Sequence, residues 1–217
     1  MTSDSVRIEK FRDLYLTIPD TKNVSEFFDN LGANLGDPWY RDANKEKEFD
    51  FITGDKAFCF VRNSDDALPS AGLTIFNKKN NEWYVPNIVP RECNELGIDL
   101  YNAILLDFWN SIKDISVRAG VDVKITDSAL SDESLLGAVG AKCLRAFSLL
   151  ANKSTGSSHP SDRKRWFDFI LNTYHLDTFS IEDLIEILKK QGWPENIAHR
   201  LAAEYEFAQE LLSYAKE

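Results

Sequence analysis

The sequence predicts an α+β protein with an antiparallel or mixed sheet of about five strands, helices on one face, and a C-terminal unit of three helices. Three observations lead to this fold class. Strand-like and helix-like apolar patterns alternate over residues 7–150, and two neighbouring strand patterns are joined by a short turn. Beyond residue 160 every apolar stripe has helical spacing.

The first strand and the first helix are predicted before residue 37. Residues 7–18 have β character and stop at Pro19, which cannot continue a ladder of hydrogen bonds. From Asn23 the apolar residues recur with helical spacing, as far as Leu35. Residues 37–50 are rich in charges and turn formers, so they are predicted to be a loop.

The centre of the chain predicts strands. Residues 49–52 and 57–62 have strand character, and the second run is almost continuously apolar, which is typical of a buried central strand. A hairpin follows, with strands at residues 72–77 and 82–85 and a polar turn at residues 78–81. Neighbouring hairpin strands favour an antiparallel sheet over a doubly wound parallel one.

The last elements of the predicted α+β domain follow two prolines. Pro86 and Pro90 are expected to force the chain out of regular pairing, because proline has no N–H to donate. Residues 97–115 predict an amphipathic helix across the sheet, residues 121–126 alternate as a half-buried strand does, and residues 131–150 predict another helix.

A polar, glycine-broken linker at residues 152–166 divides the predicted elements. The sequence therefore predicts an α+β domain over residues 1–152 and a helical subdomain over residues 153–217. In the second part, Ser180 is a predicted helix cap, and Gly192-Trp193-Pro194 ends one helix and begins the next.

The charge of the chain restricts its partners. There are 35 acidic residues against 25 lysines and arginines, a net charge of −10, with −7 in residues 1–152 and −3 in residues 153–217. Such a field repels phosphate backbones and anionic lipids, so a basic protein is the favoured partner and nucleic acid is unlikely. The longest basic run, residues 163–165, is typical of a solvated helix face. Four glutamates weaken a helix-turn-helix interpretation of residues 180–215.

The cysteines and apolar runs indicate the compartment. Cys59, Cys93 and Cys143 are odd in number and far apart, which suggests neither a disulfide framework nor a zinc site. The beginning of the chain lacks the apolar core of a leader, and no apolar run approaches the roughly 20 residues of a membrane span. A cytoplasmic protein without membrane, metal or cofactor is expected; Cys93 is the thiol expected to be most accessible.

Two motifs invite a chemical interpretation. The glycines of residues 136–142 do not have phosphate-loop spacing, and close helix packing is the favoured interpretation. His159 and Asp162 are one helical turn apart, so they could act as a base and its orienting acid, with Arg163 or Arg165 holding an anion. The favoured alternative is that His159 caps the helix and Asp162 lies near its exposed amides.

Two classes of function follow. The first is a cytosolic acidic protein that binds a basic partner, of the antitoxin, immunity or inhibitor type, with Trp39, Tyr40, Trp83 and Tyr84 as binding residues because aromatic side chains anchor interfaces. For the first pair, folding back over the core is the favoured alternative. The second class is an enzyme with a site at the junction of the α+β domain and the helical tail, built on His159 and Asp162.

Overall fold

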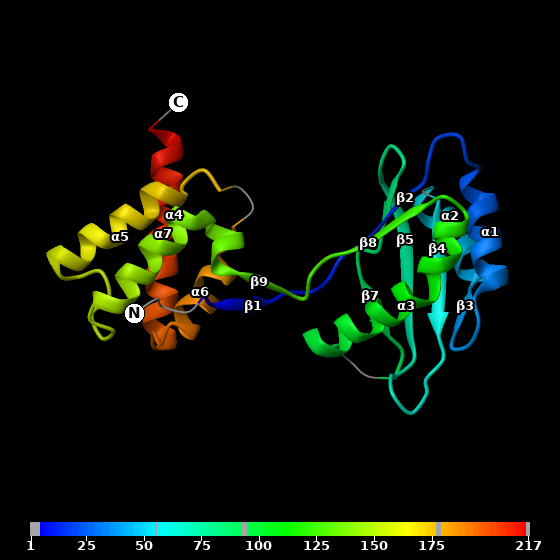
Figure 1. Cartoon of the computed structure of the whole chain (residues 1–217), viewed down its shortest axis with the longest axis horizontal. Helices are drawn as coiled ribbons and strands as arrows, with labels where there is room; N and C mark the ends of the chain where they lie inside the picture. The colour runs from blue at the N-terminus through cyan, green and yellow to red at the C-terminus, as the bar shows by residue number, and fades with distance from the viewer. Residues whose placement is uncertain (1–4, 55, 93–94, 177–178, 216–217) are drawn as a thin grey trace. The chain divides into compact units, whose positions relative to one another are not determined.

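The chain forms two compact units in the computed structural model. The described residues are 5–54, 56–92, 95–176 and 179–215. Residues 10–128 form one unit, here called the sheet unit, and residues 1–9 with 129–217 form the other, the helical unit (Figure 1). The chain therefore passes between the units twice, after residue 9 and after residue 128.

The sheet unit contains an antiparallel sheet, which confirms the predicted α+β class. Its described strands are β2 (Leu14–Thr17), β3 (Trp39–Arg41), β4 (Ala57–Arg62), β5 (Ala71–Lys79), β6 (Glu82–Tyr84), β7 (Ile88–Pro90) and β8 (Asp122–Ile125). They follow the order β3-β4-β5-β6-β2-β8, with β7 also paired to β5. The predicted β5–β6 hairpin is present, with Phe76 opposite Tyr84. The helices of this unit are α1 (Val24–Asn34), α2 (Ala43–Thr53) and α3 (Ile98–Arg118).

Aromatic packing joins α1 and α3 to one face of the sheet. Phe28 of α1 stacks on Phe58 of β4 with 3.7 Å between ring centroids, and Phe108 of α3 lies 5.3 Å from Phe60. All six residues of β4 are buried, as its apolar run predicts. Successive side chains of a strand point to opposite faces of the sheet. Because both sets of β4 side chains are buried, another element must pack on the face opposite α1 and α3.

Helix α2 supplies that cover and corrects the strand predicted at residues 49–52. The Asp42 carboxylate accepts hydrogen bonds from the amides of Asn44 and Lys45, and Gly54 ends the helix in the left-handed region at a φ of 71°. The ring of Phe49 lies 5.7 Å from that of Phe76 on the face of the sheet opposite α1 and α3. The local caps therefore outweigh the β-like character of a short apolar run.

Two segments predicted to lie outside regular pairing are short strands. Trp39–Arg41 pairs with β4, with Tyr40 opposite Val61. Ile88–Pro90 pairs with β5, with Pro90 opposite Ala71. Arg91 N donates to Ser70 O, so these two residues form a hydrogen-bonded pair. Such pairs alternate along an antiparallel ladder, so Gly72 and Val89 form the next one. Pro90 lies between these two pairs, and its backbone nitrogen points away from β5. The missing N–H of proline thus costs no bond of this ladder.

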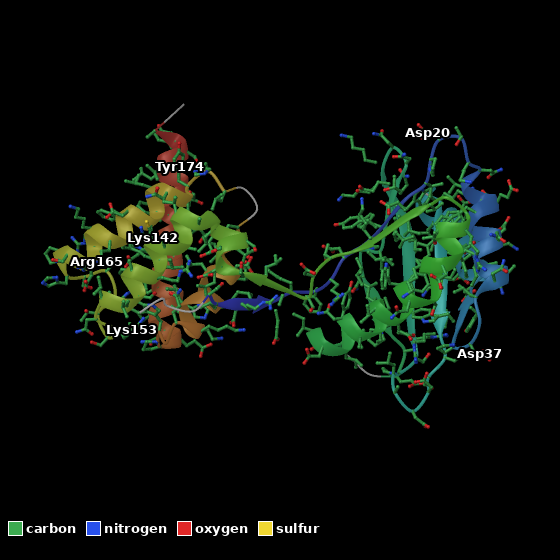
Figure 2. The ribbon with its side chains drawn as sticks, viewed as in Figure 1. Asp20, Asp37, Lys142, Lys153, Arg165 and Tyr174 are labelled. Carbon is green, nitrogen blue, oxygen red and sulfur yellow. The ribbon has the colours of Figure 1, made fainter. Side chains whose placement is uncertain are left out.

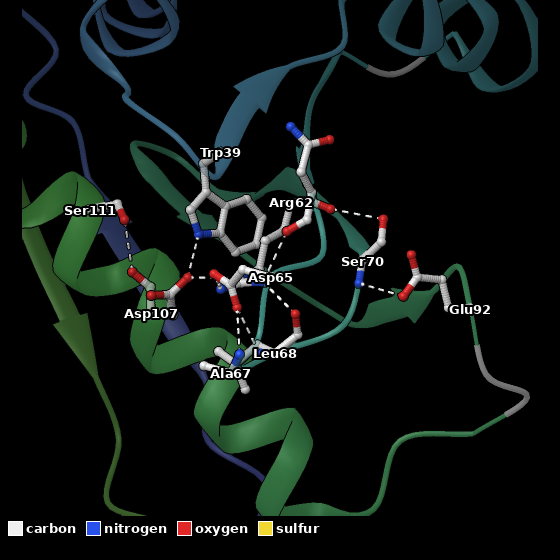
Figure 3. Close-up of polar contacts among 10 residues, drawn as sticks. Trp39, Arg62, Asp65, Ala67, Leu68, Ser70, Glu92, Asp107 and Ser111 are labelled. Carbon is white, nitrogen blue, oxygen red and sulfur yellow. Dashed lines mark hydrogen bonds and ion pairs between the residues drawn. The ribbon is translucent and has the colours of Figure 1, made fainter.

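A buried arginine connects several elements of the sheet unit (Figure 3). The Arg62 side chain is 2% exposed, and its Nε donates to Asp107 Oδ2 of α3 at 3.0 Å. Its Nη atoms donate to Asp65 Oδ2 and to the carbonyl of Leu68, at 2.6 and 2.7 Å. Trp39 Nε1 donates to the same Asp107 oxygen at 2.8 Å. Arg62 and Asp107 together therefore connect β3, β4, α3 and the loop after β4.

The helical unit combines four helices with a pair of short strands. Its described elements are β1 (Arg7–Glu9), β9 (Ala129–Ser131), α4 (Asp132–Leu150), α5 (Pro160–Thr173), α6 (Ile181–Lys190) and α7 (Glu195–Tyr214). Ile8 pairs with Leu130 in an antiparallel ladder. Phe147 of α4 stacks on Trp193 with 5.1 Å between ring centroids, at the centre of a core separate from that of the sheet unit. The three predicted C-terminal helices are present.

The sheet unit ends at residue 128, whereas the predicted domain boundary lies after residue 152. Helix α4 buries Leu144 and Phe147 completely in the core of the helical unit, so it groups with α5 to α7. The segment between α4 and α5 also packs within this unit, where Gly156, at a φ of 62°, lies against Ile197 and Leu201 of α7.

The two glycines of α4 have different roles. A Cβ atom on Gly140 would lie 2.6 Å from Thr173 Cγ2 of α5, so this glycine permits the close helix packing that the sequence predicts. Gly137 instead has a φ of 69° and interrupts the helix as a kink. A Cβ atom there would meet nothing within 4 Å, so its requirement is conformational.

We expect Gly140→Ala to destabilise the helical unit by roughly 1–3 kcal/mol, because the added methyl group collides with Thr173. Thr173→Ser removes Cγ2 and keeps the hydroxyl that donates to Phe169 O. The double variant should therefore recover most of the loss in urea denaturation followed by circular dichroism. A gain in stability from Gly140→Ala alone would contradict the close packing.

We expect Asp107→Asn to cost roughly 2–4 kcal/mol of unfolding free energy, because it leaves the buried Arg62 charge with less compensation. The matched control is Asp122→Asn, which breaks an exposed ion pair with Lys124 and should cost much less, because solvent screens this pair. Equal costs for the two variants in urea denaturation would show that the Arg62 network does not hold the unit together.

Candidate functional site

The predicted catalytic pair lies at the start of α5. His159 Nδ1 accepts a hydrogen bond from Ser161 N at 3.3 Å, so this histidine caps the helix. Asp162 is buried and accepts from Arg165 Nη1 at 3.0 Å and from Asn152 N at 3.4 Å (Figure 2 labels Arg165). The structure therefore pairs the acid with an arginine and gives the histidine a separate backbone partner.

The remaining member of this predicted set also serves the local structure. Arg163 Nη2 donates to Ser158 O at 3.3 Å, just before the helix begins. Because α4 belongs with α5, the predicted linker lies inside the helical unit. A catalytic role for His159, Asp162, Arg163 and Arg165 stays a prediction, and their observed contacts are those of a well-capped helix start.

The four aromatic residues predicted to bind a partner divide into two pairs. Trp39 and Trp83 are 2% and 5% exposed and belong to the core, which is the alternative favoured for Trp39. Tyr40 is 41% exposed on the edge strand β3, and Tyr84 is partly exposed on β6. Of these four residues, only the tyrosines therefore have substantial exposed surface, and a binding role for the set stays a prediction.

Three further features concern metal ligands, membrane-spanning helices and the thiol of Cys93. Among residues 5–54, 56–92, 95–176 and 179–215 no group of three histidine, cysteine or acidic side chains could hold a metal ion. In the same part of the chain, no helix has the length and apolar character needed to cross a bilayer. Cys93 lies outside the described residues.

A pocket of the sheet unit that the sequence analysis missed is the better candidate. It has a volume of about 480 Å³, within the usual range for ligand sites. Aromatic, proline and acidic residues line it, and we call it the Tyr101 pocket. Its lining residues are Phe11, Asp13, Pro86, Asn87, Ile88, Pro90, Glu95, Leu96 and Tyr101.

The pairing of the strands creates this pocket. Strand β4 occupies one side of β5, so β6 and β7 both pair with the other side, one after the other. Strand β2 continues the sheet beside β6, where Val85 N donates to Leu14 O at 3.1 Å. In the described part of the chain, β7 has no strand beyond it, and Phe11 and Asp13 line the pocket together with Ile88 and Pro90 of this open-edged strand.

Asn102 of α3 holds this segment in place. Its Oδ1 accepts from Arg12 N and its Nδ2 donates to Lys10 O, both at 2.8 Å, as a neighbouring strand would do. Between these two bonds, Phe11 lies edge-to-face on Tyr101, with 5.0 Å between ring centroids and an interplanar angle of 83°. Phe11 is still 55% exposed, so part of its ring can contact a ligand.

Tyr101 and Asp13 set the electrostatics of the pocket. Burial and the nearby Asp13 charge raise the pKa of Tyr101 to about 12, so its phenol is neutral at physiological pH. Asp13 N donates to Thr126 Oγ1 at 2.8 Å, which fixes the backbone of this residue. Within the described residues no hydrogen bond or ion pair engages the Asp13 carboxylate. The pocket therefore offers a negative charge beside aromatic surface.

The sequence carries a weak signal for this site. Phe11 falls in a predicted strand, and Pro86 and Pro90 flag only irregular pairing. No local period indicates that these segments meet Tyr101, which is 90 residues from Phe11 along the chain. An aromatic residue two positions before an acid, as in Phe11-Arg12-Asp13, is the one pattern that could have suggested recognition.

No protein-family model, characterised protein or solved structure matches the chain. The functional argument therefore depends on the geometry and charge of the Tyr101 pocket.

We expect Asp13→Asn to lower the pKa of Tyr101 from about 12, because the Asp13 charge is one of the two causes that raise it. NMR titration of ¹³C-labelled tyrosine resolves each phenol. The internal control is Tyr205, whose pKa is raised by burial within the helical unit and should not respond. An unchanged Tyr101 midpoint would show that Asp13 does not act on the pocket.

Proposed function

We propose that this protein is a cytoplasmic binding protein that associates with a basic protein partner, as antitoxins, immunity proteins and inhibitors do, and that the Tyr101 pocket receives a cationic side chain of that partner. The observation that supports this proposal is the Asp13 carboxylate, which has no hydrogen bond or ion pair in the described residues and lines a pocket beside the exposed ring of Phe11.

The overall charge supports a basic partner. The sheet unit, residues 10–128, has 20 acidic residues and 14 lysines and arginines, a net charge of −6. A field of this sign attracts a basic protein and accelerates the encounter at low salt. It repels nucleic acid, which agrees with the expectation from the sequence.

The local chemistry supports a side chain as the part that is recognised. Pockets that accept an anchoring side chain contribute most of the binding energy of many interfaces. A cation is attracted both to a carboxylate and to the face of an aromatic ring, and the attraction is stronger where water is excluded. Asp13 and Phe11 provide both groups, and Glu95 adds a second carboxylate to the lining.

We expect Asp13→Asn to weaken binding of the partner roughly 30-fold or more, which corresponds to about 2 kcal/mol, because it removes the charge that the pocket offers. Partners are identified by mass spectrometry after affinity purification from the native host, and each is then purified and titrated by calorimetry at several salt concentrations. Binding by the wild-type chain should weaken as salt increases.

The matched control is Asp20→Asn. Asp20 lies in the turn after β2 (Figure 2), outside the pocket lining, and its substitution makes the same change in net charge. An equal loss for both variants would point to general charge attraction without a role for the pocket. Full binding by Asp13→Asn would overturn the proposed site.

A further inference from the structure

We propose that the side chain received by the Tyr101 pocket is the guanidinium group of an arginine on a loop of the partner, and that the partner does not add a strand to the open edge of β7. This inference rests on the proposed function, since it specifies the chemistry recognised at the same site. Backbone groups of β7, the aromatic lining and the distribution of charge each support it.

Within the described residues, the open edge of β7 has backbone C=O acceptors and no free backbone N–H donor. Val89 directs its backbone N–H and C=O groups toward β5. The backbone groups of its neighbours Ile88 and Pro90 therefore point away from β5, toward the open edge. Ile88 N already donates to Asn87 Oδ1 at 2.8 Å, and Pro90 has no N–H. An added strand needs both donors and acceptors along an edge, so this edge disfavours strand addition. Its two carbonyl groups suit a ligand that only donates hydrogen bonds.

A guanidinium group fits this surface better than an ammonium group. It carries five N–H donors in a plane, can bind a carboxylate through two parallel hydrogen bonds, and stacks on aromatic rings. The pocket is lined by Asp13 with its carboxylate, by the exposed ring of Phe11, and by Ile88 and Pro90, whose backbone carbonyl groups point away from β5. A lysine would bring three donors on a more strongly hydrated charge and would match fewer of these groups.

The charges around the pocket favour a cation over an anion. The lining includes Asp13 and Glu95 and contains no lysine or arginine. Helix α3 begins nearby at Ile98, where Gly97 provides no side-chain cap, and an uncapped amino end would attract an anion. Asp99 in the first turn offsets this partial positive charge. An anionic probe is therefore the appropriate counter-test.

The experiment titrates the full-length protein with three small probes and follows backbone amide signals by NMR. The probes are N-acetyl-arginine amide, N-acetyl-lysine amide and N-acetyl-glutamate amide at equal ionic strength. We expect the arginine probe to shift signals of the lining residues in a saturable way. The lysine probe should bind at least fivefold more weakly, and the glutamate probe should leave these signals unchanged.

Two variants make the test specific. Asp13→Asn should reduce the affinity for the arginine probe at least fivefold and abolish the preference over lysine. Asp20→Asn should leave both unchanged, because it lies outside the lining and makes the same change in charge. Equal affinity for arginine and lysine, saturable binding of the glutamate probe, or unchanged arginine binding by Asp13→Asn would each overturn the inference.

The partner complex separates this inference from the proposed function. Arginine-to-lysine substitutions on the partner should include one that weakens binding at least tenfold in the wild-type chain and has little effect with Asp13→Asn. If Asp13→Asn weakens the complex but no such arginine exists, guanidinium recognition fails and the proposed function stands. If the pocket selects the arginine probe but Asp13→Asn binds the partner fully, the proposed function fails instead.

Discussion

The buried guanidinium group of Arg62 constrains the whole sheet unit. A charge that is 2% exposed must find acceptors within the protein, and Arg62 finds them in Asp107 of α3, in Asp65 and in the carbonyl of Leu68. Trp39 donates to the same Asp107 oxygen, so the edge strand β3 joins the network. These directional bonds fix the position of α3 on the sheet. Aromatic packing alone is less directional and would allow several positions of the helix.

The position of α3 in turn decides whether the pocket exists. Helix α3 carries Asp107, which binds Arg62, and also Asn102 and Tyr101, which lie at the pocket. The six residues from Tyr101 to Asp107 span about 9 Å of helix. Asn102 holds the backbone of Lys10 and Arg12, and this places Phe11 against Tyr101. Helix α3 therefore connects the Arg62 network to the Tyr101 pocket at the open edge of the sheet.

The same residues of β7 protect the edge of the sheet and contribute to the chemistry of the pocket. Pro90 and the Asn87 side chain leave β7 without a free donor, and this protects an open edge against unwanted strand pairing. The carbonyl groups of Ile88 and Pro90 point away from β5, and both residues line the pocket beside Asp13, which suits the cationic donor that we propose. The net charge of −10 has the same sign as the pocket, so long-range attraction and local recognition would favour the same class of partner.

The sequence by itself determined the features that depend on neighbouring residues. It predicted the β5–β6 hairpin, the buried strand β4, the cap at His159 and the close packing at Gly140, because caps, turns and periodicity act within a few residues. Only the tertiary structure decided the features that join distant segments. Residues 7–9 pair with 129–131, α4 joins the C-terminal helices, and Phe11 meets Tyr101. Such contacts depend on which buried faces match across long stretches of chain, and a local pattern carries no record of its partner.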